Sequence, residues 1–155
     1  MIKIKTALIS VYDKSGILEL AQKLFDKNIE IISSGGTSKY LKENNIKVTE
    51  VGDYTGFSEI FEGRVKTLHP KIHAGILARG EKDSEELKKM GAKKIDLVVV
   101  NLYPFKEEVR KGSSNDEIIE KIDIGGPAML RAAAKNYKYT VAVGDPTDYS
   151  EISLD

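Results

Sequence analysis

A short turn, Ser33 to Thr37, combines two serines, two glycines and a threonine between an expected strand and an expected helix. Two glycines let the backbone come close to a ligand, and helix N-terminal amides together with hydroxyls suit a phosphate. The turn lacks the lysine that follows the last glycine of a Walker A loop, and it does not match a dinucleotide fingerprint. It therefore favours a single phosphate as ligand, although a tight turn capped by Thr37 would use the same residues.

Two cations, Arg64 and Lys66, share one face if their segment is extended, and they would offer an anion a planar fork and a point charge. A solvated basic loop is the alternative. Nearby, His69 and His73 stand four residues apart and could lie on one helical face as metal ligands. No glutamate follows His69 as in zinc proteases, and no third ligand is marked, so we predict no metal site.

Polar side chains also follow the strongest expected strand and precede a later helix. Asn101 and Tyr103 come directly after that strand, where a carboxamide and a phenol can read a heterocyclic base; packing is the alternative for Tyr103. Asp123 precedes Gly125 at a helix start, so it is either a cap or part of a site whose amides hold an oxyanion. Lys135 near the end of that helix is either an ordinary C-terminal cation or, if it is buried beside Asp123, a proton-transfer group.

The elements that position these residues alternate between strands and helices. Short apolar runs predict strands at 6–11, 29–32, 46–51, 95–102 and 139–143, and helical spacing predicts helices at 17–25, 38–44, 69–77, 84–90, 105–110, 115–122 and 125–136. We expect Asp13 or Ser15 to cap the first helix, and Pro127 to take the first position of the last one. This alternation predicts an α/β fold, with helices on both faces of an open parallel sheet and ligands beyond the carboxyl ends of its strands.

Length and composition narrow the classes of protein. The 155 residues suit one domain, and the absence of cysteine excludes disulfides, thiolate catalysis and cysteine-bound zinc. Equal numbers of basic and acidic residues provide no global field for nucleic acid or an acidic membrane. No apolar run approaches a membrane span, and Lys3 and Lys5 interrupt any signal peptide. We expect a cytoplasmic globular domain.

Taken in order, the motifs resemble one family. These motifs are 10–16 (SVYDKSG), 34–37 (SGGT), 63–70 (GRVKTLHP), 101–105 (NLYPF), 123–126 (DIGG) and 130–136 (LRAAAKN). From about Thr6 to Tyr149 they are similar to the IMP cyclohydrolase half of the bifunctional purine biosynthesis protein, which also carries AICAR transformylase. The Arg-Val-Lys-Thr-Leu-His-Pro and Asp-Ile-Gly-Gly blocks are specific to that family.

The resemblance implies a three-layer α/β/α, methylglyoxal-synthase-like fold with a five-stranded parallel sheet. It also implies a homodimer with sites near the subunit interface, and dehydrative ring closure of FAICAR to IMP without metal or organic cofactor. Its catalytic set would be Lys66, Tyr103, Asp123 and Lys135, with Lys135 as leading proton donor or acceptor. Its substrate contacts would be Ser10, Tyr12, Asp13, Lys14, Ser34, Gly35, Gly36, Thr37, Arg64, Val65, Thr67, Asn101, Ile124 and Gly125.

The resemblance also sets expectations about the extent of the protein. The family's cyclohydrolase half continues past position 155 with further helices, and the transformylase half is absent, so residues 1–155 would form a single cyclohydrolase domain without these parts. An alternative function is open, because the same fold serves as a regulatory module that binds a phosphorylated effector without chemistry. Such a module would not need the four catalytic residues together. Methylglyoxal synthase itself is disfavoured, since its Gly-Thr-Thr-Gly setting is not present.

Overall fold

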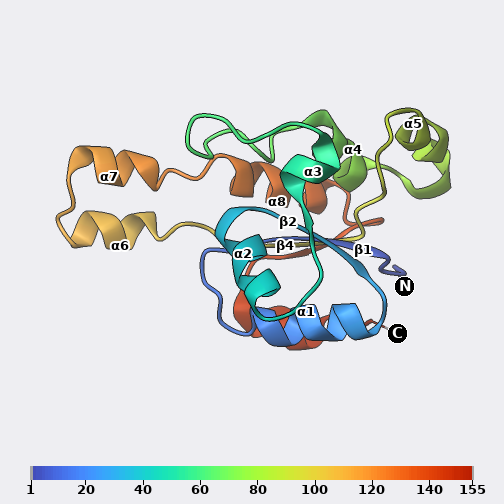
Figure 1. Cartoon of the computed structure of the whole chain (residues 1–155), viewed down its shortest axis with the longest axis horizontal. Coiled ribbons are helices and arrows are strands. Elements are labelled where there is room, and N and C mark those ends of the chain that lie inside the picture. The colour runs from blue at the N-terminus through green and yellow to red at the C-terminus, as the bar shows by residue number, and fades with distance from the viewer. Residues whose placement is uncertain (1, 155) are drawn as a thin grey trace.

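The computed structural model describes residues 2–154 and is built on one sheet of five parallel strands (Figure 1). The strands are β1 (Thr6–Ser10), β2 (Glu30–Ser33), β3 (Thr49–Glu50), β4 (Leu97–Val100) and β5 (Val141–Val143), in the spatial order β3-β2-β1-β4-β5. Every neighbouring pair is parallel. The predicted α/β fold with a five-stranded parallel sheet is confirmed.

Helices cover both faces of this sheet and make three layers (Figure 1). One face is covered by α1 (Ile17–Asp26), α2 (Gly35–Glu43) and the 3₁₀ helix η2 (Pro146–Glu151), and the other by α3 (Val51–Thr55), α4 (Pro70–Leu77) and α8 (Gly125–Lys135). The remaining helices are η1 (Gly80–Asp83), α5 (Ser84–Lys89), α6 (Phe105–Arg110) and α7 (Asn115–Glu120). The pair α6–α7 projects from the body of the molecule.

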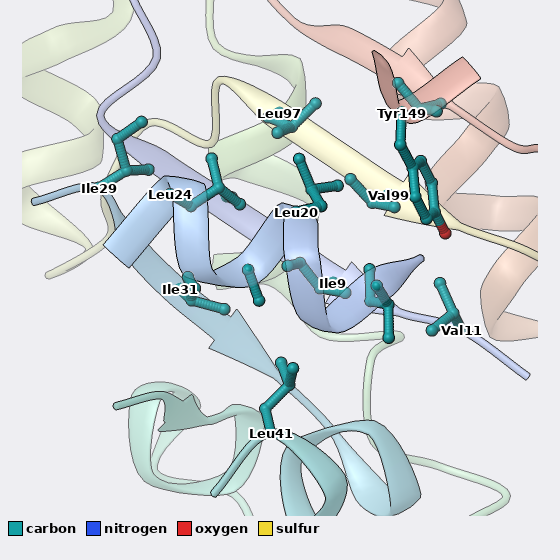
Figure 2. Close-up of a cluster of buried hydrophobic side chains, with 14 of the residues drawn as sticks. Ile9, Val11, Leu20, Leu24, Ile29, Ile31, Leu41, Leu97, Val99 and Tyr149 are labelled. Carbon is teal, nitrogen blue, oxygen red and sulfur yellow. The ribbon is translucent and has the colours of Figure 1, made fainter. Parts of the chain in front are cut away.

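Each face of the sheet has its own apolar core. Side chains alternate along a strand, so Ile9 faces α1 whereas its neighbour Leu8 faces α4 and α8. Figure 2 shows the first core, in which Leu20 and Leu24 of α1 pack against Ile9 and Leu97. All four residues of β4 are buried, as expected of a strand that is covered on both faces.

The order of the strands creates a switch point beside β1. The chain moves from β1 outward through β2 to β3, then returns to place β4 on the other side of β1. The connections that leave β1 and β4 therefore diverge to opposite faces, and they open a crevice at the carboxyl ends of these two strands. Ser10 pairs with Val100 at this edge, so Val11 and Asn101 lie at the mouth of the crevice.

Some predicted boundaries and caps are wrong. Helix α2 begins at Gly35 rather than at residue 38, and the expected strand 46–51 is reduced to two residues because α3 begins at Val51. Neither Asp13 nor Ser15 caps α1; Gly16 holds that position with a φ of 68°. Pro127 is the third residue of α8 rather than the first. At the third position it still costs no intrahelical hydrogen bond, because the first amides of a helix have no partner in it.

No helix in residues 2–154 is long and apolar enough to cross a membrane.

Gly75 makes the close contact between α4 and the chain entering β4. A Cβ at this position would lie 2.6 Å from the Lys93 carbonyl oxygen and 2.9 Å from Ile95 Cδ1. We expect Gly75→Ala to lower the free energy of unfolding by about 1–3 kcal/mol, because the backbone must shift to admit the methyl group. Gly36→Ala is the matched control, since a Cβ at Gly36 meets nothing within 4 Å. Urea unfolding of both variants tests this; equal stability of the two would contradict it.

Candidate functional site

A cavity of about 550 Å³ occupies the crevice at the carboxyl ends of β1, β2 and β4. Its walls come from the loop after β1, the start of α2, the segment 62–67, the end of α7 and the start of α8. The cavity is lined by most of the predicted site residues, namely Ser10, Tyr12, Lys14, Ser34, Gly36, Thr37, Arg64, Lys66, Thr67, Asn101, Tyr103, Asp123, Ile124 and Gly125. The structure thus brings together residues that are up to 115 positions apart in the chain, from Ser10 to Gly125.

Asn101 holds the loop that follows β1. Its Oδ1 accepts hydrogen bonds from the backbone N–H of Tyr12 (2.6 Å) and of Asp13 (2.9 Å), and its Nδ2 donates to the Asp13 carbonyl (2.9 Å). These bonds engage both ends of the carboxamide and show that Asn101 shapes the loop after β1; its predicted contact with a base stays a prediction. The Asp13 carboxylate does not line the cavity and accepts hydrogen bonds from the backbone N–H and the hydroxyl of Ser15.

Lys14 is fixed by the same loop. Its ammonium donates to the carbonyl oxygens of Val11 and Tyr12, and burial lowers the pKa of Lys14 from its ordinary value. A lysine that is partly removed from water binds an incoming anion more strongly than an exposed one, because less water separates the charges. Lys14 therefore supplies a positioned positive charge to the cavity.

The start of α2 makes a second positive wall. The Ser34 hydroxyl lies 3.3 Å from that of Ser10, and the first free amides of α2 follow at Gly35 and Gly36. The hydroxyl of Thr37, by contrast, is bonded to both the N–H and the carbonyl of Val11. Thr37 thus fastens α2 to β1, and its side chain is neither the predicted helix cap nor a free ligand group.

Lys66 lies against this helix start. A Cβ on Gly35, whose φ is +53°, would sit 3.0 Å from Lys66 Nζ. Within residues 2–154 Lys66 makes no ion pair with a carboxylate. The Glu50 carboxylate interacts electrostatically with Lys66, but an ammonium beside the positive end of a helix is further stabilised by an anion that contacts both. This arrangement supports the predicted anion site and assigns Gly35 a steric role at its edge.

Arg64 also lines the cavity, and its guanidinium pairs with Glu120, the last residue of α7. The next residue, Lys121, places its Nζ 5.6 Å from the ring centroid of Tyr12 and 5.5 Å from that of Tyr103. The two rings meet edge to face at 5.6 Å. The sequence did not point to Glu120 or Lys121, because no local pattern marks them. Arg64, the partner of Glu120, is 56 residues away, and Tyr103, the nearer partner of Lys121 in the sequence, is about 18 residues away.

The start of α8 closes the site. Asp123 lies one residue before Ile124, the N-cap of α8, and its Oδ1 accepts from the Gly126 N–H at 2.8 Å, so it satisfies an amide of the first turn as a capping side chain does. A Cβ on Gly125 would lie 2.4 Å from Thr67 Oγ1, so only glycine allows this approach. Burial, and then the charge of Asp123, raise the pKa of Tyr103 and keep its phenol protonated. Asp123 and Tyr103 thus share one end of the cavity.

The comparisons with known proteins agree with this geometry. Residues 16–128, more than two thirds of the chain, match the model of the MGS-like domain. The chain belongs to the MGS-like domain family. A solved structure of ForH is similar, with a TM-score of 0.81 and 35% identity over 97% of this chain and 78% of ForH. The predicted methylglyoxal-synthase-like fold is confirmed.

Curated relatives of this MGS-like domain share one description. The chain is 59% identical over 150 residues to the "Bifunctional purine biosynthesis protein PurH" of Clostridium perfringens, and 55% identical to that of Persephonella marina. These matches cover 96% of this chain but only 30% and 29% of the relatives. The chain therefore spans about 30% of the length of the PurH proteins that it matches.

Four of the predicted site residues do not line the cavity of this MGS-like domain, namely Asp13, Gly35, Val65 and Lys135. Lys135 is exposed at the far end of α8, which rises about 15 Å from its start at Gly125. The next residue, Asn136, donates to the carbonyls of Ile76 and Ala78 at the end of α4, away from the cavity. Within one chain Lys135 is therefore not buried beside Asp123, and its predicted catalytic role stays a prediction. Val65 also lies outside the cavity lining, in a bridge to Ile60.

The two histidines of this domain have separate environments. His69 caps α4 by accepting the Lys71 N–H at its Nδ1 (3.1 Å), and burial lowers the pKa of His73. Among the described residues, no group of three or more His, Cys, Asp or Glu side chains is placed to hold a metal ion.

Proposed function

We propose that this chain is the IMP cyclohydrolase part of a bifunctional purine biosynthesis protein and closes the ring of FAICAR to give IMP. The single observation that carries the proposal is the cavity at the β1–β4 switch point, which joins a positive end to a polar end in a chain closely similar to PurH. The positive end is formed by Lys14, Lys66, Arg64 and the start of α2. The polar end is formed by Tyr103, Asp123 and the start of α8.

The reaction requires the protein to hold the phosphate of the substrate, to stabilise an oxyanion and to transfer protons. The carboxamide nitrogen of FAICAR attacks the formamide carbon and a new C–N bond forms. The former carbonyl oxygen then leaves as water with two protons, one lost by the carboxamide nitrogen and one lost by the formamide nitrogen as its C=N bond forms. The positive end would hold the 5′-phosphate, which fixes the substrate and brings the two reacting groups together. The free amides at Ile124 and Gly125 would stabilise the oxyanion that forms on the formamide oxygen.

Proton transfer would fall to side chains at the polar end and to Lys66. Asp123 would accept the proton that the attacking nitrogen loses, and the protonated phenol of Tyr103 would donate to the departing oxygen. Lys135 could join them only from a second copy of the chain, because its own helix carries it away from the cavity. We accordingly propose a homodimer in which α8 of one copy serves the cavity of the other.

The names of the relatives bear on the alternative function, which is binding of a phosphorylated effector without catalysis. The PurH relatives are named for a bifunctional biosynthesis protein, and nothing in them favours a non-catalytic module that only binds a phosphorylated effector. Adding FAICAR to the purified chain and following the absorbance of IMP separates the two. Turnover is expected; tight IMP binding without turnover would favour the effector module. In the full-length, cytoplasmic protein, a transformylase domain would supply the FAICAR.

Arg64 provides a direct test of the phosphate end. We expect Arg64→Ala to weaken IMP binding by roughly tenfold or more, because a charge-assisted contact to phosphate is lost, and to leave binding of inosine almost unchanged. Calorimetry with both ligands measures the difference, and Arg79→Ala, which removes an exposed arginine outside the cavity, is the control. Equal losses for IMP and inosine would mean that Arg64 does not contact phosphate.

A further inference from the structure

We infer that Glu120 is a positioning residue, which holds the guanidinium of Arg64 in place to receive the phosphate of the substrate. This inference rests on the proposed function, since it names a residue that prepares the same site. Both Glu120 and Arg64 line the cavity, and they form the ion pair that connects α7 to the segment 62–67.

The geometry of the pair leaves room for a ligand. Arg64 donates from Nε to Glu120 Oε2 at 3.4 Å and from Nη2 to Glu120 Oε1. A guanidinium carries five N–H groups around a planar fork, so a carboxylate on the Nε–Nη2 edge leaves the Nη1 hydrogens and one Nη2 hydrogen free. The edge that remains is the one that a phosphate can bind with two parallel hydrogen bonds.

Arg64 needs such support because its own segment provides little. The side chain is 59% exposed, and the residues before it, Phe61, Glu62 and Gly63, all have positive φ angles and belong to no helix or strand. A long side chain on such a loop samples many rotamers, and a ligand must order it on binding. The ion pair with Glu120 restricts these rotamers before the ligand arrives, so binding costs less conformational entropy.

The same ion pair ties the α6–α7 hairpin to the body of the domain. Neither α6 nor α7 contains a buried residue, and the hairpin projects outward from the sheet (Figure 1). Ile119 and Ile122 on either side of Glu120 nevertheless line the cavity. Holding Arg64 therefore also holds this wall of the cavity against the site.

The negative charge of Glu120 opposes this effect, since it repels a phosphate. The two anions would lie on opposite edges of one guanidinium, and both partners of the ion pair are more than half exposed, so water and salt screen the repulsion. The hydrogen bonds that orient Arg64 act at contact distance, where salt screens them less than it screens two anions held apart on opposite edges of the guanidinium. We therefore expect the positioning effect to exceed the repulsion.

The test compares Glu120→Gln with Asp116→Asn, which removes the same charge from an exposed position at the start of α7. Ribose 5-phosphate, IMP and inosine are titrated into each variant by calorimetry. We expect Glu120→Gln to raise the Kd for both phosphate ligands by about two- to tenfold, and to leave inosine and the Asp116→Asn variant unaffected. In an Arg64→Ala background, Glu120→Gln should cause no further loss, because the two residues act as one unit.

Four results would overturn the inference: unchanged or tighter phosphate binding in Glu120→Gln, an equal loss in Asp116→Asn, a further loss in the Arg64→Ala background, or a wild-type chain that binds neither phosphate ligand. A chain that binds ribose 5-phosphate in a Glu120-dependent way but does not convert FAICAR would support this inference and refute the proposed activity. The two proposals can therefore fail separately.

Discussion

An equal mixture of Lys66→Ala and Lys135→Ala subunits is expected to recover about a quarter of the wild-type rate of FAICAR ring closure, whereas each variant alone is nearly inactive. The reason is that Lys66 and Lys135 lie far apart within one chain. The Lys66 ammonium lies beside the start of α2 in the cavity, whereas Lys135 lies at the end of α8 that is far from the cavity. If both act in one site, they come from different copies.

The magnitudes follow from the proposed roles. A positioned acid or base typically contributes about 10²–10⁴-fold, so each single variant should lose kcat by that factor. Random pairing makes half of the dimers mixed, and a mixed dimer contains one site with both lysines intact. Kinetics before and after mixing and subunit exchange measure the recovery.

Two controls separate proton transfer from a structural effect. Lys138→Ala changes an exposed lysine just beyond α8 and should leave the rate unchanged. Lys135→Arg should restore little, since a guanidinium does not release its proton near neutrality. Mixtures no more active than their components would contradict the shared site, and a fully active Lys135→Arg variant would rule out proton transfer by Lys135.

Asp123→Asn is the second change with a large expected effect. An amide oxygen can still accept the hydrogen bond from the Gly126 N–H, so the cap on α8 is preserved while the negative charge beside Tyr103 is lost. We expect kcat to fall by about 10²–10⁴-fold with little change in the free energy of unfolding. Asp123→Ala should lose the same activity and, in addition, about 0.5–2 kcal/mol of stability, because the cap is gone.

The pair of variants distinguishes the two roles that sequence alone leaves open for Asp123. Asp145 offers a matched control: its carboxylate accepts from the Thr147 N–H at the start of η2, outside the cavity, and Asp145→Asn should leave kcat unchanged. Steady-state kinetics and urea unfolding of all three variants provide the readout. An Asp123→Asn enzyme with near wild-type kcat would show that Asp123 is a cap and nothing more.

The sequence by itself determined the class of fold and the loops that form the site. Its apolar runs are short, and the apolar residues of its helices recur at regular helical spacing. This local information is enough to predict alternating strands and helices, because side-chain burial follows the period of each element. The strand Leu97–Val100, apolar on both faces, had to be central. Lys14, Ser34 and Tyr103 lie in loops that follow strands, so the rule that ligands bind beyond the carboxyl ends of parallel strands gathered them at one edge of the sheet.

Only the tertiary structure decided which polar groups are free to act. The Thr37 hydroxyl is bound to Val11 and the Asn101 carboxamide to the 12–13 loop, over separations of 26 and 88–89 residues. The ion pair of Arg64 with Glu120 and the exposure of Lys135 are equally non-local. The sequence shows which residues carry hydrogen-bond donors and acceptors. Which donor pairs with which acceptor depends on strand order and helix direction, and these are set by the packing of the whole sheet.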